Sequence, residues 1–347
     1  MNISVVGIDL AKNVFQLCAL GTNGSVVWNR KVTRSKFAAM LADLPKSALI
    51  AMEACSSSNY WGRYLTERGY RVALIPAQHV KPFAKRQKND ANDALAICEA
   101  ATRPGIHFVS VKTIEQQDIK TLRTIRRRVV QQRTATGNQI RALAGEYGVV
   151  FPIGLRRLIS AVPAALEDAE NGLSIIARAL LSQSLHRLHE MDRLVTDLTT
   201  QIGQLCKQLP SYSALQSIPG MGPLVSAALI SEIGDGRQFK NGRQMAAWLG
   251  LVPRQYSSGG KLVLGSITKH GNNDLRVLLV HGARAVVRFA QRRSDPLGEW
   301  LRGLIARRGR HRAIVALANK LVRIAWSVLA TQKRFDVALA FAPMRTA

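Results

Sequence analysis

Four carboxylates in the first third of the chain have the types and spacing of a metal site. Asp9 ends the apolar segment ISVVGID, and Glu53 lies near the end of a second apolar segment, ALIAMEA. Asp90 and Asp93 stand three residues apart in KNDANDALAI, which has the composition of a helix start, so they would share one helix face. Converging carboxylates without a basic partner repel one another, and a divalent cation removes that repulsion. A set of oxygen ligands alone favours Mg²⁺.

The chemistry of such a site is phosphoryl transfer. Two metal ions roughly 3.5–4 Å apart activate the nucleophile and stabilise the leaving oxygen. Each acid alone has a simpler explanation, because Asp9 could cap a turn and Asp90 or Asp93 could cap a helix. Glu53 is harder to explain in this way, since an unpaired carboxylate beside an apolar core is costly. The order of the four acids along the chain favours the metal site.

A second group of reactive residues lies in the segment QYSSGGK. Ser257 and Ser258 precede two glycines, which suits a tight exposed turn. A serine hydroxyl attacks a phosphate only with help from cations or a base, and four cations are close in the sequence: Arg254, Lys261, Lys269 and Arg276. On the residues alone, a flexible loop that contacts phosphates is the better supported interpretation.

Two further segments have features of nucleic-acid binding. The run Arg126, Arg127 and Arg128 lies in a charged stretch that predicts a helix over about 113–144. The segment LQSIPGMGPLVSAALISEIGD, with Gly220 and Gly222 in its turn, is similar to a helix-hairpin-helix element. In such elements the backbone amides at a helix N-terminus hold a phosphate.

The charge of the whole chain indicates a polyanionic partner. Lys and Arg number 49 and Asp and Glu 22 in 347 residues, which gives a net charge of +27. The basic excess is 7 in residues 1–110, 5 in 111–210 and 15 in 211–347. Cations that neutralise phosphates release condensed counterions, so this surplus favours nucleic acid as the partner. The C-terminal third is the predicted main binding face.

The elements that must position the acids form a mixed α/β pattern. Short apolar runs predict three consecutive strands, ISVVGID, VFQLCAL and SVVWNRKV, with a turn at 22–24 between the last two. A helix over about 35–44, the strand ALIAMEA, a helix over about 60–68 and the strand YRVALIP follow. This βββαβαβ order is that of an RNase-H-like sheet. Its first and fourth strands are neighbours, which would bring Asp9 and Glu53 side by side.

The rest of the chain is predicted to be mostly helical. Long amphipathic helices are expected over about 113–144 and 173–209, with Pro152 and Pro163 breaking the chain between them. The pair could form an antiparallel hairpin or coiled-coil stalk suited to self-association, or an ordinary helical subdomain. We therefore predict three domains, with boundaries at 1–110, 111–210 and 211–347.

Other features limit the class of protein. The four cysteines have no metal-site spacing and are expected to be reduced core residues of a cytosolic protein. His186 and His189 lie three apart, but a solvated helix face explains them better than a metal pair. No signal peptide is predicted, and Lys320 and Arg323 interrupt the longest apolar helix, so no membrane span is expected.

The motifs together identify a family resemblance that covers nearly the whole chain. VVGIDLAKNVF, AMEAC, KNDANDALAI, IPGMGPLVSAAL, AAWLGLVPRQYSSGGK and ITKHGNNDLR resemble the DEDD transposases of bacterial insertion sequences, family 110, the bridge-RNA-guided recombinases. The resemblance implies a RuvC-like nuclease domain whose acids match Asp9, Glu53, Asp90 and Asp93, with Mg²⁺ as cofactor. It also implies a C-terminal transposase domain with a nucleophilic serine before a glycine, which places it at Ser258. The doubled serine leaves Ser257 as an adjacent candidate.

The resemblance further implies the partners. A structured guide RNA would pair with donor and target DNA, in a cytoplasmic, nucleoid-associated bacterial protein that forms a dimer or tetramer. Folded RNA is bound largely through shape and phosphates, which fits basic charge spread over all three regions. Two other functions stay open. A RuvC-like Holliday-junction nuclease would use the same acids without a serine, and a non-enzymatic DNA-binding protein would need neither.

Overall fold

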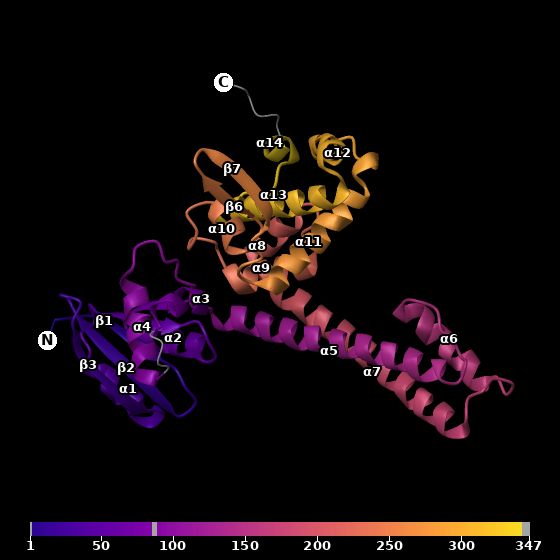
Figure 1. The fold of residues 1–347 in the computed structure, drawn as a ribbon, viewed down its shortest axis with the longest axis horizontal. Coiled ribbons are helices and arrows are strands. Elements are labelled where there is room, and N and C mark those ends of the chain that lie inside the picture. The colour runs from indigo at the N-terminus through magenta and orange to yellow at the C-terminus, as the bar shows by residue number, and fades with distance from the viewer. Residues whose placement is uncertain (1, 85–88, 342–347) are drawn as a thin grey trace. The chain divides into compact units, whose positions relative to one another are not determined.

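The computed structural model describes residues 2–84 and 89–341 (Figure 1). The chain divides into two compact units. Unit 1 comprises Met1–Ile114 and Asp235–Gln244, and unit 2 comprises Glu115–Gly234 and Met245–Ala347. Unit 1 is thus completed by a short segment from far along the chain. Within it, the Ser110 hydroxyl donates to Gln238 Oε1 at 2.8 Å, and the Gln244 amide lies 2.6 Å from the His107 ring.

Unit 1 is built on a mixed five-stranded sheet of order β3-β2-β1-β4-β5. The first three strands are antiparallel neighbours, whereas β4 and β5 join β1 in parallel. The predicted order of strands and helices is confirmed, and each predicted strand overlaps an observed one: β1 (Ile3–Asp9), β2 (Val14–Gly21), β3 (Val26–Thr33), β4 (Leu49–Glu53) and β5 (Arg71–Ile75).

Alternating side chains of the sheet enter two separate cores. Val6 and Ile8 of β1 pack in a cluster with Phe37 of α1 (Arg34–Ala42) and Trp61 of α2 (Ser58–Glu67). Val5 points to the other face, where α4 (Asp90–Thr102) covers the sheet. This two-sided burial is why β1 reads as a nearly continuous apolar run. The short helices α3 (Ala77–Val80) and η1 (Lys81–Phe83) follow β5.

Two long helices of unit 2 run side by side in opposite directions. They are α5 (Ile114–Gly145) and α7 (Ile175–Lys207). Arg126 Nε donates to Thr199 Oγ1 at 2.6 Å, and Arg133 pairs with Asp192 further along the two helices. Val129, Val195 and Leu198 form the apolar contact between the helices. An antiparallel hairpin of helices, one of the predicted arrangements, is present.

The prediction that Pro163 breaks the chain is wrong. Pro163 lies inside α6 (Leu155–Glu167), a helix that was not predicted. Two apolar side chains of this helix, Leu158 and Val162, are fully buried against α7 and the end of α5. Tertiary packing of this apolar face therefore outweighs the lost backbone hydrogen bond of proline.

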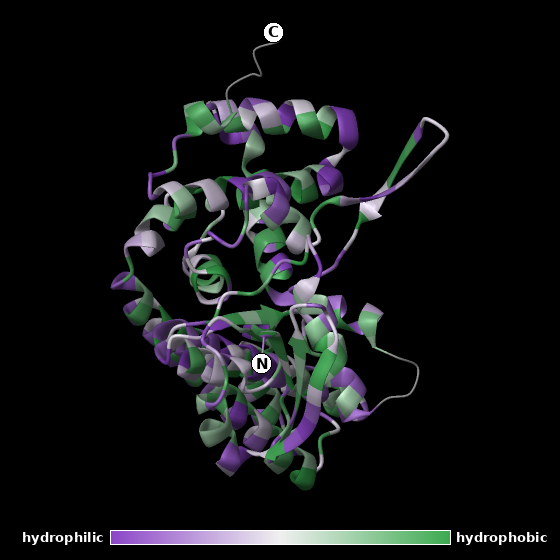
Figure 2. Cartoon of the chain, turned by 90° about the vertical axis from the view of Figure 1, so that its left-hand side faces the viewer, coloured by the Kyte–Doolittle hydropathy of each residue, from purple (hydrophilic) through white to green (hydrophobic). Residues whose placement is uncertain are grey.

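The remainder of unit 2 is mostly helical, as predicted. In chain order its elements are α8 (Pro210–Gln216), α9 (Pro223–Ile233), α10 (Gly242–Trp248, whose first residues belong to unit 1), β6 (Pro253–Ser258), β7 (Lys261–Ile267), α11 (Asn273–Arg288), η2 (Ala290–Arg292), α12 (Pro296–Arg308), α13 (Arg310–Thr331) and α14 (Val337–Phe341). Among the described residues of this part, the exception to the helical pattern is the hairpin of β6 and β7, which extends away from the helices of unit 2 (Figure 2).

Helix α13 forms the centre of this helical core. Lys320 and Arg323 do not interrupt it, contrary to the prediction, because the helix is continuous over 22 residues. Among the described residues it alone is long and apolar enough to cross a membrane. Half of its apolar stretch is buried within the protein, as in the core helix of a globular domain, so its length and composition are only weak support for a membrane span.

Candidate active site

The serine motif forms a β-hairpin whose tip is exposed. Ser258 ends β6, Lys261 begins β7, and Gly259 and Gly260 between them have φ angles of 54° and 78°. Positive φ at both central residues defines a type I′ turn, which glycine adopts without strain. The predicted tight exposed turn is present, but the two strands were missed. Nearly all of their side chains are exposed, so the signal in the sequence is the Gly-Gly pair of the turn and not a buried face.

The register of the hairpin separates the two candidate serines. Ser258 lies opposite Lys261, whereas Ser257 lies opposite Leu262 on the other face. The Cβ atoms of such cross-strand pairs are about 4.5–5.5 Å apart, so the Ser258 hydroxyl shares a face with an ammonium group. The Ser257 hydroxyl accepts a hydrogen bond from Gln255 Nε2 at 2.9 Å. The two serines thus differ in their electrostatic surroundings.

The base of the hairpin is fixed although its tip is exposed. Arg276 is only 7% exposed, and its guanidinium donates to the carbonyls of Leu249 and His270 on the two sides of the hairpin base, at 3.0 and 2.9 Å. The backbone of Gly271 approaches Trp248 so closely that a Cβ would lie 2.0 Å from its carbonyl oxygen. These contacts hold together the two chain segments that enter and leave the hairpin.

Asp9 and Glu53 lie at adjacent strand ends, as the predicted strand order requires. Ile8 of β1 is level with Met52 of β4 in parallel register, and the acids follow at the next positions. Both carboxylates lie near the thiol of Cys55, whose pKa is raised first by partial desolvation and then by the negative charges of Glu53 and Asp9. Cys55 is exposed, which contradicts the prediction that all four cysteines are core residues.

The acids of α4 have a different environment. Asn89 caps the helix by accepting from the Asn92 amide, and Asp90 and Asp93 follow in the first turn. Asp90 forms an ion pair with Lys31 of β3 at 3.0 Å, with both side chains largely exposed. Among the described residues, no group of three or more Asp, Glu, His or Cys side chains stands ready to hold a metal ion.

The fit of this region to a divalent metal is therefore partial. Two carboxylates share one sheet edge, and their oxygen donors suit Mg²⁺. Asp90 has a basic partner in Lys31, whereas the sequence predicted four acids without one. A complete four-acid site would require the first turn of α4 to exchange this ion pair for contact with the metal.

The residues predicted to contact nucleic acid differ in their exposure. Arg254, Lys261 and Lys269 are exposed on the hairpin and at its base. Gly222 caps α9, and Gly220 packs against the backbone of Gly282 on α11, so Gly220 also has a packing role. Arg126 and Arg127 line a pocket of unit 2, and Arg128 is exposed outside it. The burial of Arg276 speaks against the contact predicted for it.

Comparison with known proteins decides the family. A model of DEDD transposases of IS110 type, described as "Transposase", matches residues 6–148, and one described as "Transposase IS116/IS110/IS902 family" matches residues 212–297. The chain belongs to the IS110/IS116 transposases. This family membership confirms the resemblance found in the sequence, and it implies a DNA substrate.

Full-length relatives support the same assignment. The chain is 42% identical to the "Transposase for insertion sequence element IS1111A" of Coxiella burnetii, over 96% of this chain and 92% of the relative. It is 43% identical to a "Probable family 20 transposase" of Pseudomonas aeruginosa, over 96% and 98%. The "Transposase for insertion sequence element IS1328" of Yersinia enterocolitica is 35% identical, over 94% and 97%. This IS110/IS116 transposase therefore matches its relatives along almost their whole length.

Proposed function

We propose that this transposase cuts and exchanges DNA strands through a covalent phosphoserine intermediate formed by Ser258. The observation that carries the proposal is the hairpin, which presents Ser258 at an exposed tip above a fixed base. Lys261 on the same face would attract the phosphate and favour the alkoxide over the hydroxyl. Ser257, on the opposite face and hydrogen-bonded to Gln255, lacks this arrangement.

The proposed step is a phosphoryl transfer with conserved bond energy. The Ser258 oxygen attacks a DNA phosphorus, a serine–phosphate bond forms, and the bond from phosphorus to one strand oxygen breaks. The serine proton is released, and the departing strand end takes up a proton as a free hydroxyl. Because one phosphodiester is exchanged for another, a second strand end can reverse the step without ATP.

The acids would supply the metal chemistry. Asp9, Glu53, Asp90 and Asp93 would hold Mg²⁺, which stabilises negative charge on phosphate oxygens when bound. The RNase-H-like strand order of unit 1 and the adjacent positions of Asp9 and Glu53 support this part of the proposal. The serine hairpin must then reach the acids, within one protomer or between two of a dimer or tetramer.

The wider functional proposal follows the family resemblance. A RuvC-like part (1–110), a helical stalk (111–210) and a transposase part (211–347) would act with a structured guide RNA on donor and target DNA in the bacterial cytoplasm. The net charge of +27, distributed over all three parts, supports a large polyanionic partner. The antiparallel pair α5 and α7 offers a surface for self-association.

The covalent intermediate gives a direct test. Ser258→Ala should bind DNA as the wild type does and form no adduct, because the attacking oxygen is absent. Ser257→Ala is the matched control and should retain adduct formation within about tenfold. The measurement is denaturing electrophoresis of the full chain with labelled donor DNA and guide RNA after a stalled reaction.

The same assay separates the alternative. An adduct that persists in Ser258→Ala but is lost in Ser257→Ala would transfer the role to Ser257. Strand cleavage by wild type and both variants without any adduct would indicate a hydrolytic RuvC-like Holliday-junction nuclease instead.

A further inference from the structure

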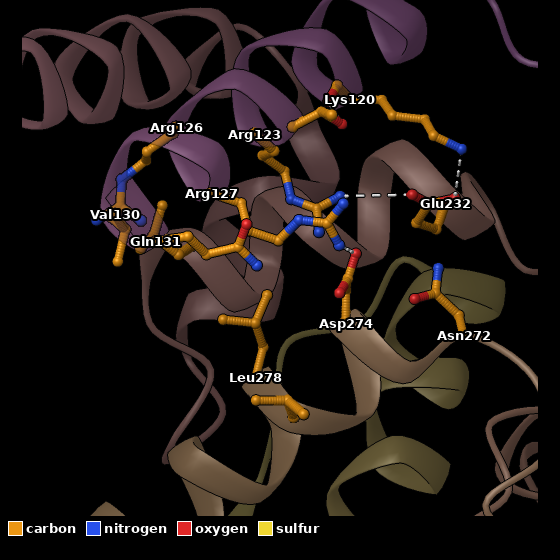
Figure 3. A pocket seen from close by; sticks show the side chains of 13 residues that line it. Lys120, Arg123, Arg126, Arg127, Val130, Gln131, Glu232, Asn272, Asp274 and Leu278 are labelled. Carbon is orange, nitrogen blue, oxygen red and sulfur yellow. Dashed lines mark hydrogen bonds and ion pairs between the residues drawn. The ribbon is translucent and has the colours of Figure 1, made fainter. Parts of the chain in front are cut away.

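A pocket of about 700 Å³ lies among helices α5, α9 and α11 within unit 2 (Figure 3). The proposed chemistry of the serine and the acids does not use it. Its volume is in the range of pockets that hold a nucleotide-sized ligand. Four cations of α5 contribute to its lining, namely Lys120, Arg123, Arg126 and Arg127, against two acids, Glu232 and Asp274. The pocket thus has two more positive than negative side chains.

Four of the six charged side chains form a deep pair and a rim pair, while Lys120 also pairs with Glu232 at 3.4 Å and Arg126 donates to Thr199 on α7. Arg123 and Glu232 approach to 3.6 Å with side chains only 12% and 10% exposed, and Arg123 also donates to the Ser231 hydroxyl at 2.7 Å. Arg127 pairs with Asp274 at the rim, where these side chains are 49% and 44% exposed. Figure 3 shows the Arg123 and Arg127 guanidinium groups meeting between the two acids.

The deep and the rim ion pairs differ in how readily a ligand can replace one partner. The deep pair is enclosed and already satisfied, so it holds its geometry. The rim pair is open to water, where an ion pair between side chains contributes little. An arginine binds a phosphate through two parallel hydrogen bonds, which is a stronger interaction than a solvated pair with a carboxylate. A phosphate can therefore replace Asp274 as the partner of Arg127, next to Arg123.

The remaining lining is suited to a base. Val130, Leu224, Val277 and Leu278 supply apolar surface from three helices. Gln131 and Asn272 add amides at the edge of this surface, although the Asn272 carbonyl already accepts from the Leu275 amide as the cap of α11. The cations suit the phosphate of a nucleotide, and the apolar wall with amides at its edge suits the face and the edge of a base. Single-strand binding sites likewise combine phosphate contacts with base contacts, although they stack the bases on aromatic rings, whereas this wall is aliphatic.

We propose that this pocket binds one unstacked nucleotide of a single-stranded nucleic acid, with the phosphate on Arg127 and the base against the apolar wall. The proposal rests on nucleic acid being the substrate of this family, and not on Ser258 or the acids. RNA and DNA share the recognised chemistry. Asp274 then acts as an internal anion that occupies the phosphate position until a strand arrives.

Oligonucleotide binding to the full chain tests the proposal. The probes are single-stranded oligothymidylate and oligouridylate of about eight nucleotides, each carrying one photoreactive 5-iodouracil, at moderate salt. Ultraviolet crosslinking followed by peptide mapping locates the base, and anisotropy measures affinity. We expect crosslinks on α5, α9 or α11 residues of the pocket. Comparison of the two probes shows whether the site prefers DNA or RNA.

Four variants separate the pocket from general charge. Arg127→Gln should weaken binding roughly tenfold or more, because the variant cannot form the charge-assisted hydrogen bonds to the phosphate. Val277→Trp fills the cavity without changing charge and should weaken binding to a similar extent. Asp274→Asn should strengthen binding severalfold, since the competing carboxylate is gone. Arg187→Gln, an exposed position on α7, is the matched control for the removal of one charge and should stay within about twofold.

The outcomes are distinct. Wild-type crosslinks and affinity in Val277→Trp, together with equal effects of Arg127→Gln and Arg187→Gln, would overturn the pocket and leave only general attraction to phosphates. Weaker binding in Asp274→Asn would refute the exchange of carboxylate for phosphate. Neither readout needs strand cleavage, so a failure here is distinguishable from a failure of the phosphoserine mechanism.

Discussion

At the scale of single residues, position within an element changes what a side chain can do. The run Arg126 to Arg128 looks uniform in the sequence, but helical phase divides it. Arg126 and Arg127 both line the pocket, Arg126 also donates to Thr199, and Arg128 is exposed outside the pocket. Strand alternation divides Ser257 from Ser258 in the same way. Which side chains share a face is predictable once the element is known. The burial of Arg276 is not predictable in this way, because it depends on carbonyls that are distant in the sequence.

The acids provide a prediction at this scale. Asp9→Asn and Glu53→Gln keep the shape of each side chain and remove one negative charge. We expect each to reduce Mg²⁺-dependent strand cleavage by at least about 100-fold, because a metal ligand is removed, while DNA affinity is maintained or slightly increased. The measurement is the cleavage rate of labelled donor DNA as a function of Mg²⁺ concentration.

A matched control is available in the same unit. Asp43→Asn makes the same chemical change at an exposed helix end and should cleave as the wild type does. Wild-type rates in both Asp9→Asn and Glu53→Gln would exclude a metal site at these strand ends.

At the scale of elements, predictions succeeded where a periodic pattern continued for a whole strand or helix. Strands β1, β2, β4 and β5 and the two long helices were identified because apolar residues mark their buried faces, whereas the largely exposed β3 was identified from the turn that precedes it. The hairpin at 253–267 was missed because nearly all of its side chains are exposed, so no buried face marks it. Helix α6 was missed because Pro163 was interpreted as a break, although packing against α7 maintains the helix.

The fixed base of the hairpin provides a prediction at the scale of elements. Gly271→Ala would place a Cβ 2.0 Å from the Trp248 carbonyl oxygen, at a φ of +74° that alanine rarely adopts. We expect the free energy of unfolding to fall by about 2–5 kcal/mol, from overpacking and backbone strain together. Adduct formation should fall with it, because Ser258 loses its support. Urea denaturation followed by circular dichroism measures the first effect.

Gly303→Ala is the control for Gly271→Ala. Gly303 lies in α12, where an added Cβ meets no atom within 4 Å. Alanine there should leave stability unchanged or raise it by up to about 1 kcal/mol, because alanine favours the helix. Equal denaturation midpoints for the two variants would show that the hairpin base tolerates a side chain and is not fixed by this close approach.

At the scale of the whole molecule, net charge is the property that can be obtained most directly from the sequence. Residues 211–347 carry an excess of 15 cations. Some of these cations form contacts within the protein, because Arg276 and Arg302 donate hydrogen bonds to backbone carbonyls. The cations around the turn between α12 and α13, in contrast, are exposed to solvent. This turn carries five basic residues in six positions, all exposed: Arg307, Arg308, Arg310, His311 and Arg312.

The turn between α12 and α13 also has an unfavourable local arrangement. Arg307 and Arg308 suit the C-terminus of α12, but Arg310 and Arg312 stand in the first turn of α13, where the helix dipole opposes positive charge. Cations in such a position are stabilised by an external anion. We therefore expect this turn to contact phosphates, and its contribution to appear in the salt dependence of the full chain.

We predict that replacing Arg307, Arg308, Arg310 and Arg312 together by Gln flattens the plot of log affinity against log salt. The slope on duplex DNA should fall by roughly 0.9 for each phosphate that is no longer neutralised, or by about 3.6 if all four cations contact phosphates. The control removes the same number of charges from exposed positions of the helical region 111–210: Arg156, Arg157, Arg187 and Arg193. Affinity of the full chain for duplex DNA is measured at several salt concentrations. If both quadruple variants change the slope equally, the DNA responds to total charge alone. A larger change in the first variant places a main DNA-binding surface on the C-terminal third.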